Sequence, residues 1–207
     1  MTLDEGYIKY QSHWSPGPAP DAAAARLLEE WRRPLFAAGL VGHYDELGIG
    51  FGNLSTRSGA PGQFLITGTQ SGHIARTTTE HYSLVTAFDI DRNEVSCTGP
   101  ARASSEAMTH AAIYALDPSI NAIVHVHSKP LWDQYLYVLP TTASDVSYGT
   151  PEMAAEFGRL YDESAFGPDG VAVMGGHDEG LISIGESLER AATRILTLNE
   201  KQQDLIR

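Results

Sequence analysis

Two histidines with one residue between them, His125 and His127, form the pair whose spacing most directly suggests chemistry. They lie in the run IVHVH (residues 123–127), which has the β-branched, apolar composition of a short strand. Side chains at positions i and i+2 of a strand leave it on the same face, so both imidazoles would point in one direction. Neutral imidazole binds divalent metals such as zinc. The pair therefore predicts a metal site, although two histidines hydrogen-bonded within a half-buried strand would give the same pattern.

A third metal ligand is offered by His177, which lies in the sequence GGHDEG (residues 175–180). Glycines on both sides allow close approach of the backbone to other groups. Three imidazoles with an open coordination position would form a catalytic site. Two alternatives remain: His177 is only a polar residue of a turn, or Asp178 or Glu179 replaces it or adds a ligand. Zinc is the first choice for such a site, and manganese, iron or cobalt would also accept it.

The sequence Ser104-Ser105-Glu106 precedes a stretch with helical spacing that ends near Leu116. Either serine could cap this helix, and capping alone would explain the motif. A helix N-terminus also presents free N–H groups to an anion. A glutamate in the first turn could reach a nearby metal or a substrate carbon. The motif therefore has both a structural and a functional interpretation.

The elements that must position these residues indicate an α/β fold, with helices flanking one sheet. Asp21 is the expected N-cap of the first helix, which Pro34 should kink or end. Periodicity predicts helices over residues 22–38, 104–116, 151–164 and 186–201, strands over residues 63–67, 122–127 and 170–174, and a hairpin within residues 88–98. The proline-rich run before Asp21 separates an N-terminal arm, residues 1–20, from one domain, residues 21–207.

Composition narrows the classes of function. A net charge of −12 argues against nucleic acid as a partner, because phosphate-backbone binding depends on clustered Lys and Arg. No segment approaches the roughly 20 apolar residues that span a bilayer, and the first residues resemble no targeting signal. Cys97 is the only cysteine, which fits a reducing compartment. We therefore expect a soluble, cytoplasmic protein with no membrane partner, whose small and anionic substrate is bound by local N–H and hydroxyl groups.

In this order and spacing, the motifs resemble the class II aldolase/adducin family, and within it the fuculose-phosphate aldolase and ribulose-phosphate epimerase group. The resemblance covers about residues 22–200. It rests on GNLS (residues 52–55), IT (66–67), SG (71–72), SSE (104–106), AAIY (111–114), HVH (125–127), the His177 loop and SLERA (187–191). It implies a three-layer α/β/α sandwich with a central mixed, largely antiparallel sheet, assembled as a homo-oligomer such as a tetramer.

The resemblance also implies a role for individual residues. His125 and His127, together with His177, would bind the metal, and Glu106 would move a proton at the carbon next to a carbonyl. The metal would polarise the substrate carbonyl and stabilise an enediolate. The residues that match the phosphate-binding site of the sugar-phosphate aldolases are Asn53, Ser71, Gly72, Ser104 and Ser105.

Two departures from the family pattern affect the predicted reaction. The family usually has its histidine directly before glycine, whereas Asp178 and Glu179 separate His177 from Gly180. The tyrosine acid of the sugar-phosphate aldolases has no clear match, because Tyr148 belongs by its spacing to the following motif. Three functions follow as hypotheses: aldol cleavage, condensation or epimerisation of a sugar phosphate or similar hydroxy-carbonyl compound; decarboxylation or dehydration of a small acid; or a non-enzymatic, adducin-like binding module.

Overall fold

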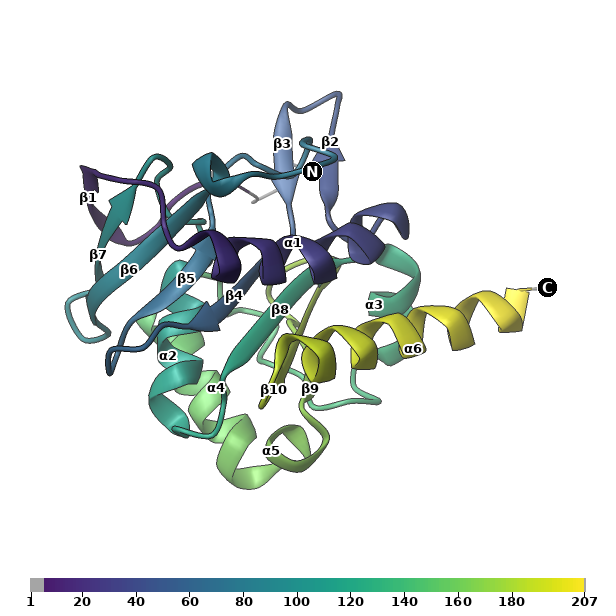
Figure 1. Ribbon diagram of the computed structural model, residues 1–207. Coiled ribbons are helices and arrows are strands. Elements are labelled where there is room, and N and C mark those ends of the chain that lie inside the picture. Colours follow the sequence, from purple (N-terminus) through teal and green to yellow (C-terminus); the bar gives the residue numbers. More distant parts are fainter. Residues whose placement is uncertain (1–5, 207) are drawn as a thin grey trace.

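A computed structural model describes residues 6–206, in which an eight-stranded sheet forms the centre of the molecule (Figure 1). The strands follow the order β1 (Gln11–Pro16), β7 (Glu94–Gly99), β6 (Tyr82–Asp89), β5 (Phe64–Thr67), β4 (Asn53–Arg57), β8 (Ala122–His127), β10 (Gly180–Gly185) and β9 (Val171–Val173). Neighbouring strands are antiparallel except for β1 and β7, which are parallel. The prediction of a mixed, largely antiparallel sheet is confirmed. A separate hairpin joins β2 (Gly42–Tyr44) and β3 (Ile49–Phe51).

Helices cover both faces of the sheet and complete the predicted three layers. One face carries α1 (Ala22–Ala37), α3 (Lys129–Tyr135) and α6 (Leu188–Ile206), and the other carries α2 (Ala107–Leu116), α4 (Pro151–Glu163) and α5 (Phe166–Asp169). In Figure 1, α1 and α6 cross the face of the sheet nearer the viewer. No helix within the described part of the chain has the length and apolar character needed to cross a membrane.

Successive side chains of the central strand β8 point alternately into the two apolar cores on either side of the sheet. Ile123 belongs to the apolar core on the α2 side, whereas Val124 and Val126 belong to the core beneath α1 and α6. Successive side chains of a strand point to opposite faces, so His125 and His127 point to the same side as Ile123. The strand therefore aims both imidazoles at the layer that contains α2.

Helix α1 begins where the sequence predicted, but it ends later than the position of Pro34 suggested. The Asp21 carboxylate accepts hydrogen bonds from the N–H groups of Ala23 and Ala24, at 3.0 and 2.9 Å. The helix then continues through Pro34 to Ala37. Leu35 is fully buried against the sheet, and this packing favours the last turn although proline supplies no N–H group.

Part of the predicted N-terminal arm lies in the sheet. Residues 11–16 form β1, which pairs in parallel with β7 along one edge. Most side chains of this strand are polar and exposed, as is typical of a sheet edge, and the half-buried Trp14 alone gave no apolar alternation from which a strand could be predicted. The division of the chain at residues 20 and 21 stays a prediction.

Candidate metal centre

Three imidazoles converge at one point, which we call the histidine cluster (His125, His127 and His177). His125 and His127 come from the end of β8, and His177 comes from the turn between β9 and β10. The Nε2 atom of His127 lies 3.1 Å from the Nε2 atoms of both His125 and His177. Two imidazole nitrogens on one tetrahedral zinc ion lie roughly 3.4 Å apart, given zinc–nitrogen distances of about 2.0–2.1 Å. The cluster therefore has nearly the geometry that such an ion requires.

Burial keeps the histidine cluster in its metal-binding protonation state. It lowers the pKa of His125 to about 4. Burial, reinforced by the neighbouring imidazoles, also places the pKa values of His127 and His177 well below the ordinary value of 6.5. All three rings are therefore neutral near pH 7, so each can offer a nitrogen lone pair to a metal.

Hydrogen bonds outside the cluster orient two of the rings. Nδ1 of His125 lies 3.0 Å from the carbonyl oxygen of Leu181, which turns Nε2 of the same ring toward the cluster. Nδ1 of His127 lies 3.4 Å from the Tyr44 hydroxyl, which donates to the Glu179 carboxylate at 2.6 Å. Glu179 therefore supports His127 through Tyr44, as outer partners of metal ligands commonly do.

Glycine is required beside the cluster. A Cβ atom on Gly180 would lie only 2.8 Å from Cδ2 of His177 and 3.3 Å from Cε1 of His125. A side chain at this position would therefore push the rings apart. Of the two acids that separate His177 from Gly180, Asp178 is exposed, and Glu179 contacts Tyr44. Among the described residues, the group that could hold a metal consists of the three histidines.

Glu106 lies directly beside the cluster. Its carboxyl group is 1% exposed, and Oε1 is 3.3 Å from Nε2 of His177 and 4.0 Å from Nε2 of His125. Apart from these contacts, neither carboxylate oxygen has a partner with good hydrogen-bond geometry among the described residues, although the side chain of Thr109 is close enough to lower the pKa of Glu106. Burial raises the pKa of Glu106 to about 7. Burial outweighs the effect of Thr109, so the ionised carboxylate is costly here and the position favours a bound cation or a proton on the carboxyl group.

Helix α2 begins one residue later than the predicted serine cap, although the Ser104 hydroxyl still accepts a hydrogen bond from the Glu106 N–H at 3.3 Å. Glu106 itself occupies the N-cap position, without a capping hydrogen bond from its side chain. Ala103 is bridged to Gly68, and the Ser104 N–H donates to the carbonyl oxygen of Thr67 at 3.2 Å. This pairing keeps the chain extended until after Ser104, which delays the start of the helix.

All five residues predicted to bind phosphate line one small polar pocket. They are Asn53, Ser71, Gly72, Ser104 and Ser105. Asn53 is opposite His125 in the register of β4 and β8, and Ser105 precedes Glu106, so the pocket adjoins the histidine cluster. The Asn53 Oδ1 atom is buried and has no hydrogen-bond partner among the described residues. The pocket thus contains hydroxyl groups, an amide and exposed backbone of the kind that bind an oxyanion.

Similarities to known proteins agree with this geometry. Residues 36–132 match the sequence model of a family described as Class II Aldolase and Adducin N-terminal domain. The resemblance to the class II aldolase/adducin family is confirmed. The matched segment contains Glu106, His125, His127 and the phosphate-pocket residues, whereas His177 lies beyond it.

Solved structures with a similar fold include two aldolases. L-fuculose-1-phosphate aldolase from Thermus thermophilus has a TM-score of 0.65 and 23% identity, over 90% of this chain and 94% of that one. The sugar-phosphate aldolase from Thermotoga maritima has a TM-score of 0.66 and 17% identity, over 89% and 94%. YgbL from Klebsiella pneumoniae, described as a candidate aldolase/epimerase/decarboxylase, has a TM-score of 0.67 and 20% identity, over 89% and 88%. The chain therefore has the class II aldolase fold.

Within this class II aldolase fold, the structure adds a residue that the sequence analysis did not select. Arg32 of α1 is 1% exposed, and its guanidinium donates to the carbonyl oxygens of Ser71 and Gly72 at 3.1 and 3.4 Å. A Cβ atom on Gly72 would lie 1.9 Å from the carbonyl oxygen of Gly42, so only glycine fits there. Arg32, whose guanidinium also lies 3.8 Å from the Glu29 carboxylate, therefore supports the Ser71–Gly72 turn behind the polar pocket.

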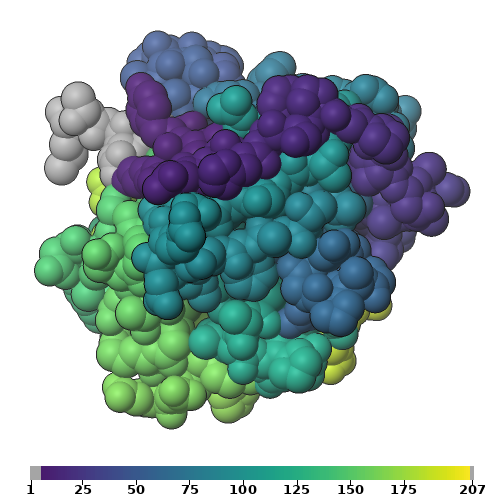
Figure 2. Space-filling model, turned by 90° about the vertical axis from the view of Figure 1, so that its left-hand side faces the viewer, coloured from purple at the N-terminus to yellow at the C-terminus, as the bar shows by residue number. Residues whose placement is uncertain are grey.

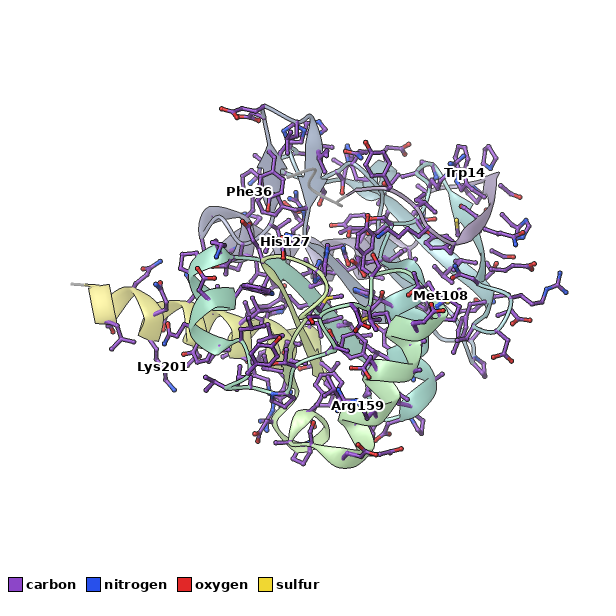
Figure 3. All side chains as sticks on the ribbon, turned by 180° about the vertical axis from the view of Figure 1, so that it is seen from behind. Trp14, Phe36, Met108, His127, Arg159 and Lys201 are labelled. Atoms are coloured by element: carbon purple, nitrogen blue, oxygen red, sulfur yellow. The ribbon has the colours of Figure 1, made fainter. Side chains whose placement is uncertain are left out.

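Tyr148 is the nearest match to the tyrosine acid of the sugar-phosphate aldolases, but its hydroxyl is engaged elsewhere. The hydroxyl accepts a hydrogen bond from the Tyr7 N–H and donates one to the Tyr7 carbonyl oxygen, both at 3.1 Å. Its ring packs against His177, with 4.5 Å between ring centroids. Tyr148 therefore positions His177, at the end of the sheet where Figure 3 labels His127.

Proposed function

We propose that this chain is a divalent-metal-dependent lyase that cleaves or forms a carbon–carbon bond in a sugar phosphate or similar hydroxy-carbonyl compound. The observation that supports this most strongly is the position of Glu106. A buried carboxylate with a pKa of about 7 lies 3.3 Å from one of three converging, neutral imidazoles. This combination suits proton transfer beside a bound cation.

Each group in the site has a part in this proposal. His125, His127 and His177 hold the metal, for which zinc is the first choice and manganese, iron or cobalt are alternatives. When bound, the metal acts as a Lewis acid on the substrate carbonyl and favours an enediolate. In condensation, Glu106 removes the proton from the carbon next to that carbonyl, and in cleavage it returns a proton to the same carbon.

The polar pocket binds the anionic group of the substrate in this proposal. The hydroxyl groups of Ser104 and Ser105 are small donors at a confined space, which Ser71 also lines while its own hydroxyl donates to the carbonyl oxygen of Gly68 at 2.8 Å. The Arg32 guanidinium, paired with Glu29 at 3.8 Å, holds the carbonyl oxygens of the Ser71–Gly72 turn. Local hydrogen-bond donors are needed in this pocket because the chain as a whole has a net charge of −12, which repels an anion at long range.

A second candidate is decarboxylation or dehydration of a small acid by the same groups. It is favoured by Tyr148, whose hydroxyl is bonded to the backbone of Tyr7 instead of facing a substrate. Loss of carbon dioxide requires no tyrosine to exchange a proton with a departing aldehyde, so Glu106 and the cluster could suffice. Similarity to YgbL, whose description includes decarboxylation, is compatible with this reaction.

The first experiment is the metal content of the purified, untagged protein, measured by plasma mass spectrometry. Wild type should contain about one equivalent of metal per chain, as the three-histidine cluster implies. The double variant His125→Ala/His127→Ala should contain none. His13→Ala is the matched control, because His13 is exposed on β1 and lies outside the cluster.

Turnover then separates the reactions. Metal-loaded wild type is assayed with phosphorylated hydroxy-ketones for aldol cleavage and with small keto and hydroxy acids for release of carbon dioxide. Absence of metal, even after reconstitution with zinc, manganese and cobalt, would refute the lyase proposal and favour an adducin-like binding module. The predicted cytoplasmic homo-oligomer, such as a tetramer, stays a prediction that light scattering and cell fractionation would check.

A further inference from the structure

Glu179, in the turn between β9 and β10, has a strained backbone conformation. Its φ angle is 67°, in the left-handed region that glycine adopts freely and residues with a side chain rarely adopt. Its carbonyl oxygen accepts a hydrogen bond from the Ser128 N–H at 2.9 Å, so a contact outside the turn helps to fix this conformation. Backbone strain of this kind commonly marks a position whose side chain has a function.

The Glu179 side chain joins the turn to a distant part of the chain. Its carboxylate accepts a hydrogen bond from the Tyr44 hydroxyl at 2.6 Å, a distance typical of a hydroxyl that donates to an ionised carboxylate. Such bonds are stronger than those between neutral groups. Tyr44 is the last residue of β2, and the turn carries His177. The bond therefore connects the β2–β3 hairpin to the histidine cluster.

The same hairpin packs against a second member of the cluster, His127. The Phe51 ring lies 5.5 Å from the His127 ring and 4.5 Å from the Tyr44 ring, between centroids. The hairpin projects from the top of the molecule in Figure 1, and Figure 2 shows its blue surface at the same end. A two-stranded hairpin is at best marginally stable alone, so its position over His127 depends on contacts such as the one with Glu179.

The Tyr44 oxygen also lies 3.4 Å from Nδ1 of His127. Because Tyr44 donates its proton to Glu179, the oxygen accepts from His127, which places the imidazole proton on Nδ1. Nε2 of His127 then directs its lone pair toward the rest of the cluster, where the other two Nε2 atoms each lie 3.1 Å away. A contact of 3.4 Å is long for a hydrogen bond, so it affects the tautomer and orientation of the ring more than its donor strength.

We propose that Glu179 is a positioning residue for the metal, which fixes the tautomer and orientation of His127 through Tyr44. This inference rests on the proposed function, and it places Glu179 outside the metal coordination, one step behind a ligand. Glycine at this position would relieve the strain and remove the carboxylate together. Stability and metal affinity should therefore respond in opposite directions to one substitution.

Zinc affinity, measured by competition with a chromophoric chelator, tests this role. Glu179→Gly should bind zinc about 10–100-fold more weakly than wild type, the range expected when an outer partner of a metal ligand is lost. Its metal-free form should melt at the wild-type temperature or higher, because glycine adopts the left-handed conformation without strain. Glu179→Gln should have an affinity between the two, because its amide oxygen still accepts from Tyr44.

Two further variants show whether the effect passes through Tyr44. Tyr44→Phe should weaken zinc binding by a factor similar to that of Glu179→Gly. The double variant Tyr44→Phe/Glu179→Gly should bind zinc no more weakly than either single variant, since both remove the same contact. Asp178→Asn is the matched control, because Asp178 is the exposed acid next to Glu179 in the same turn. Its zinc affinity should equal that of wild type.

The outcomes separate this inference from the proposed function. Wild-type zinc affinity in Glu179→Gly overturns the role of Glu179. A loss that Tyr44→Phe does not share also overturns it, because Glu179 would then bind the metal directly. Equal losses in Glu179→Gly and Asp178→Asn would show a general effect of charge, and a lower melting temperature of metal-free Glu179→Gly would show a structural role; both contradict the proposal. These results leave the metal site standing, whereas absence of zinc from wild type would refute both.

Discussion

The two ends of helix α2 differ in how well their buried polar groups are hydrogen-bonded. At the N-terminal end, the Glu106 carboxylate is buried, and neither of its oxygens has a partner with good hydrogen-bond geometry among the described residues, although the Thr109 side chain and the charge of Lys9 lower its pKa. At the C-terminal end, the Arg57 guanidinium donates to the carbonyl oxygens of Tyr114, Ile120 and Asp117, at 2.5, 2.6 and 3.1 Å. The second arrangement satisfies carbonyl groups that a helix leaves unpaired at its end. The first leaves a cost that a ligand could offset.

This difference suggests how one helix serves both stability and function. A polar group that is satisfied within the chain contributes to folding and needs nothing further. A buried group without a partner lowers stability until a cation, proton or substrate arrives. Substitutions at the N-terminal end of α2 should therefore change ligand binding and turnover, and substitutions at its C-terminal end should change stability.

Replacement of Glu106 should have the largest effect. Glu106→Gln should lower turnover by about 10²–10⁴-fold, because the amide cannot accept the substrate proton. Its melting temperature should not fall, since a neutral amide costs less to bury than a carboxylate. Steady-state turnover and thermal unfolding would measure both effects, with the exposed Glu200→Gln as control. Normal turnover in Glu106→Gln would refute the proposed proton transfer by Glu106. It would also refute the idea that the N-terminal end of α2 serves function and the C-terminal end serves stability.

Replacement of Arg57 should reverse this pattern. Arg57→Met removes the guanidinium from three carbonyl groups, of which Asp117 keeps the Ile120 N–H as a donor, and should lower the free energy of unfolding by about 2–4 kcal/mol. Metal content should stay the same, because Arg57 lies at the opposite end of α2 from Glu106. Urea unfolding would measure the change, with Arg92→Met as the control, since the Arg92 side chain is 70% exposed. A loss of metal without a loss of stability would contradict the comparison.

A smaller effect is expected at the polar pocket beside Glu106. Ser105→Ala should weaken the binding of inorganic phosphate about tenfold, which corresponds to the loss of one hydrogen bond to a charged group. Its melting temperature should change little. Ser119→Ala is the matched control, because Ser119 is exposed near the other end of α2. Equal phosphate affinity in Ser105→Ala and Ser119→Ala would show that Ser105 does not contribute to anion binding.

The smallest effect concerns acid pH at the C-terminal end. A hydrogen bond from the Tyr161 hydroxyl, followed by bonds from Ser119, lowers the pKa of Asp117 below its ordinary 3.8. A lowered pKa means that Asp117 stabilises the fold above pH 3.8 and loses this contribution as the pH falls through its folded value. Tyr161→Phe should therefore lose less stability than wild type between pH 5 and pH 2. Parallel acid unfolding curves for the two proteins would show that this contact has no role.

The elements that the sequence predicted were those with strong local signals. The β-branched run around His125 became β8, and the Asp21 cap and apolar spacing of α1 were in place. The edge strand β1 was missed, because its pairing partner β7 lies some 80 residues away and most of its side chains are polar and exposed. The strand β10 was also missed: it is buried on both faces, so it shows no alternation, and it begins and ends with glycine.

The residue types of the candidate site could be predicted from the sequence, but their close approach in space could not. Spacing placed His125 and His127 on one face of a strand, since that relation depends only on local backbone geometry. His177 reaches them because β10 pairs with β8 in a register that sets Gly180 opposite His127. Their functional roles, and that of Glu106, stay predictions.

The sequence by itself determined the helices and strands with strong periodicity, the metal-binding residue types and the family resemblance. Tertiary structure alone decided that Lys9, Arg32 and Tyr44 lie around the same site. These three residues come from the N-terminal segment, α1 and β2. Nothing in their local sequence specifies a shared neighbourhood, because contacts between distant segments depend on strand order and on the packing of helices against the sheet.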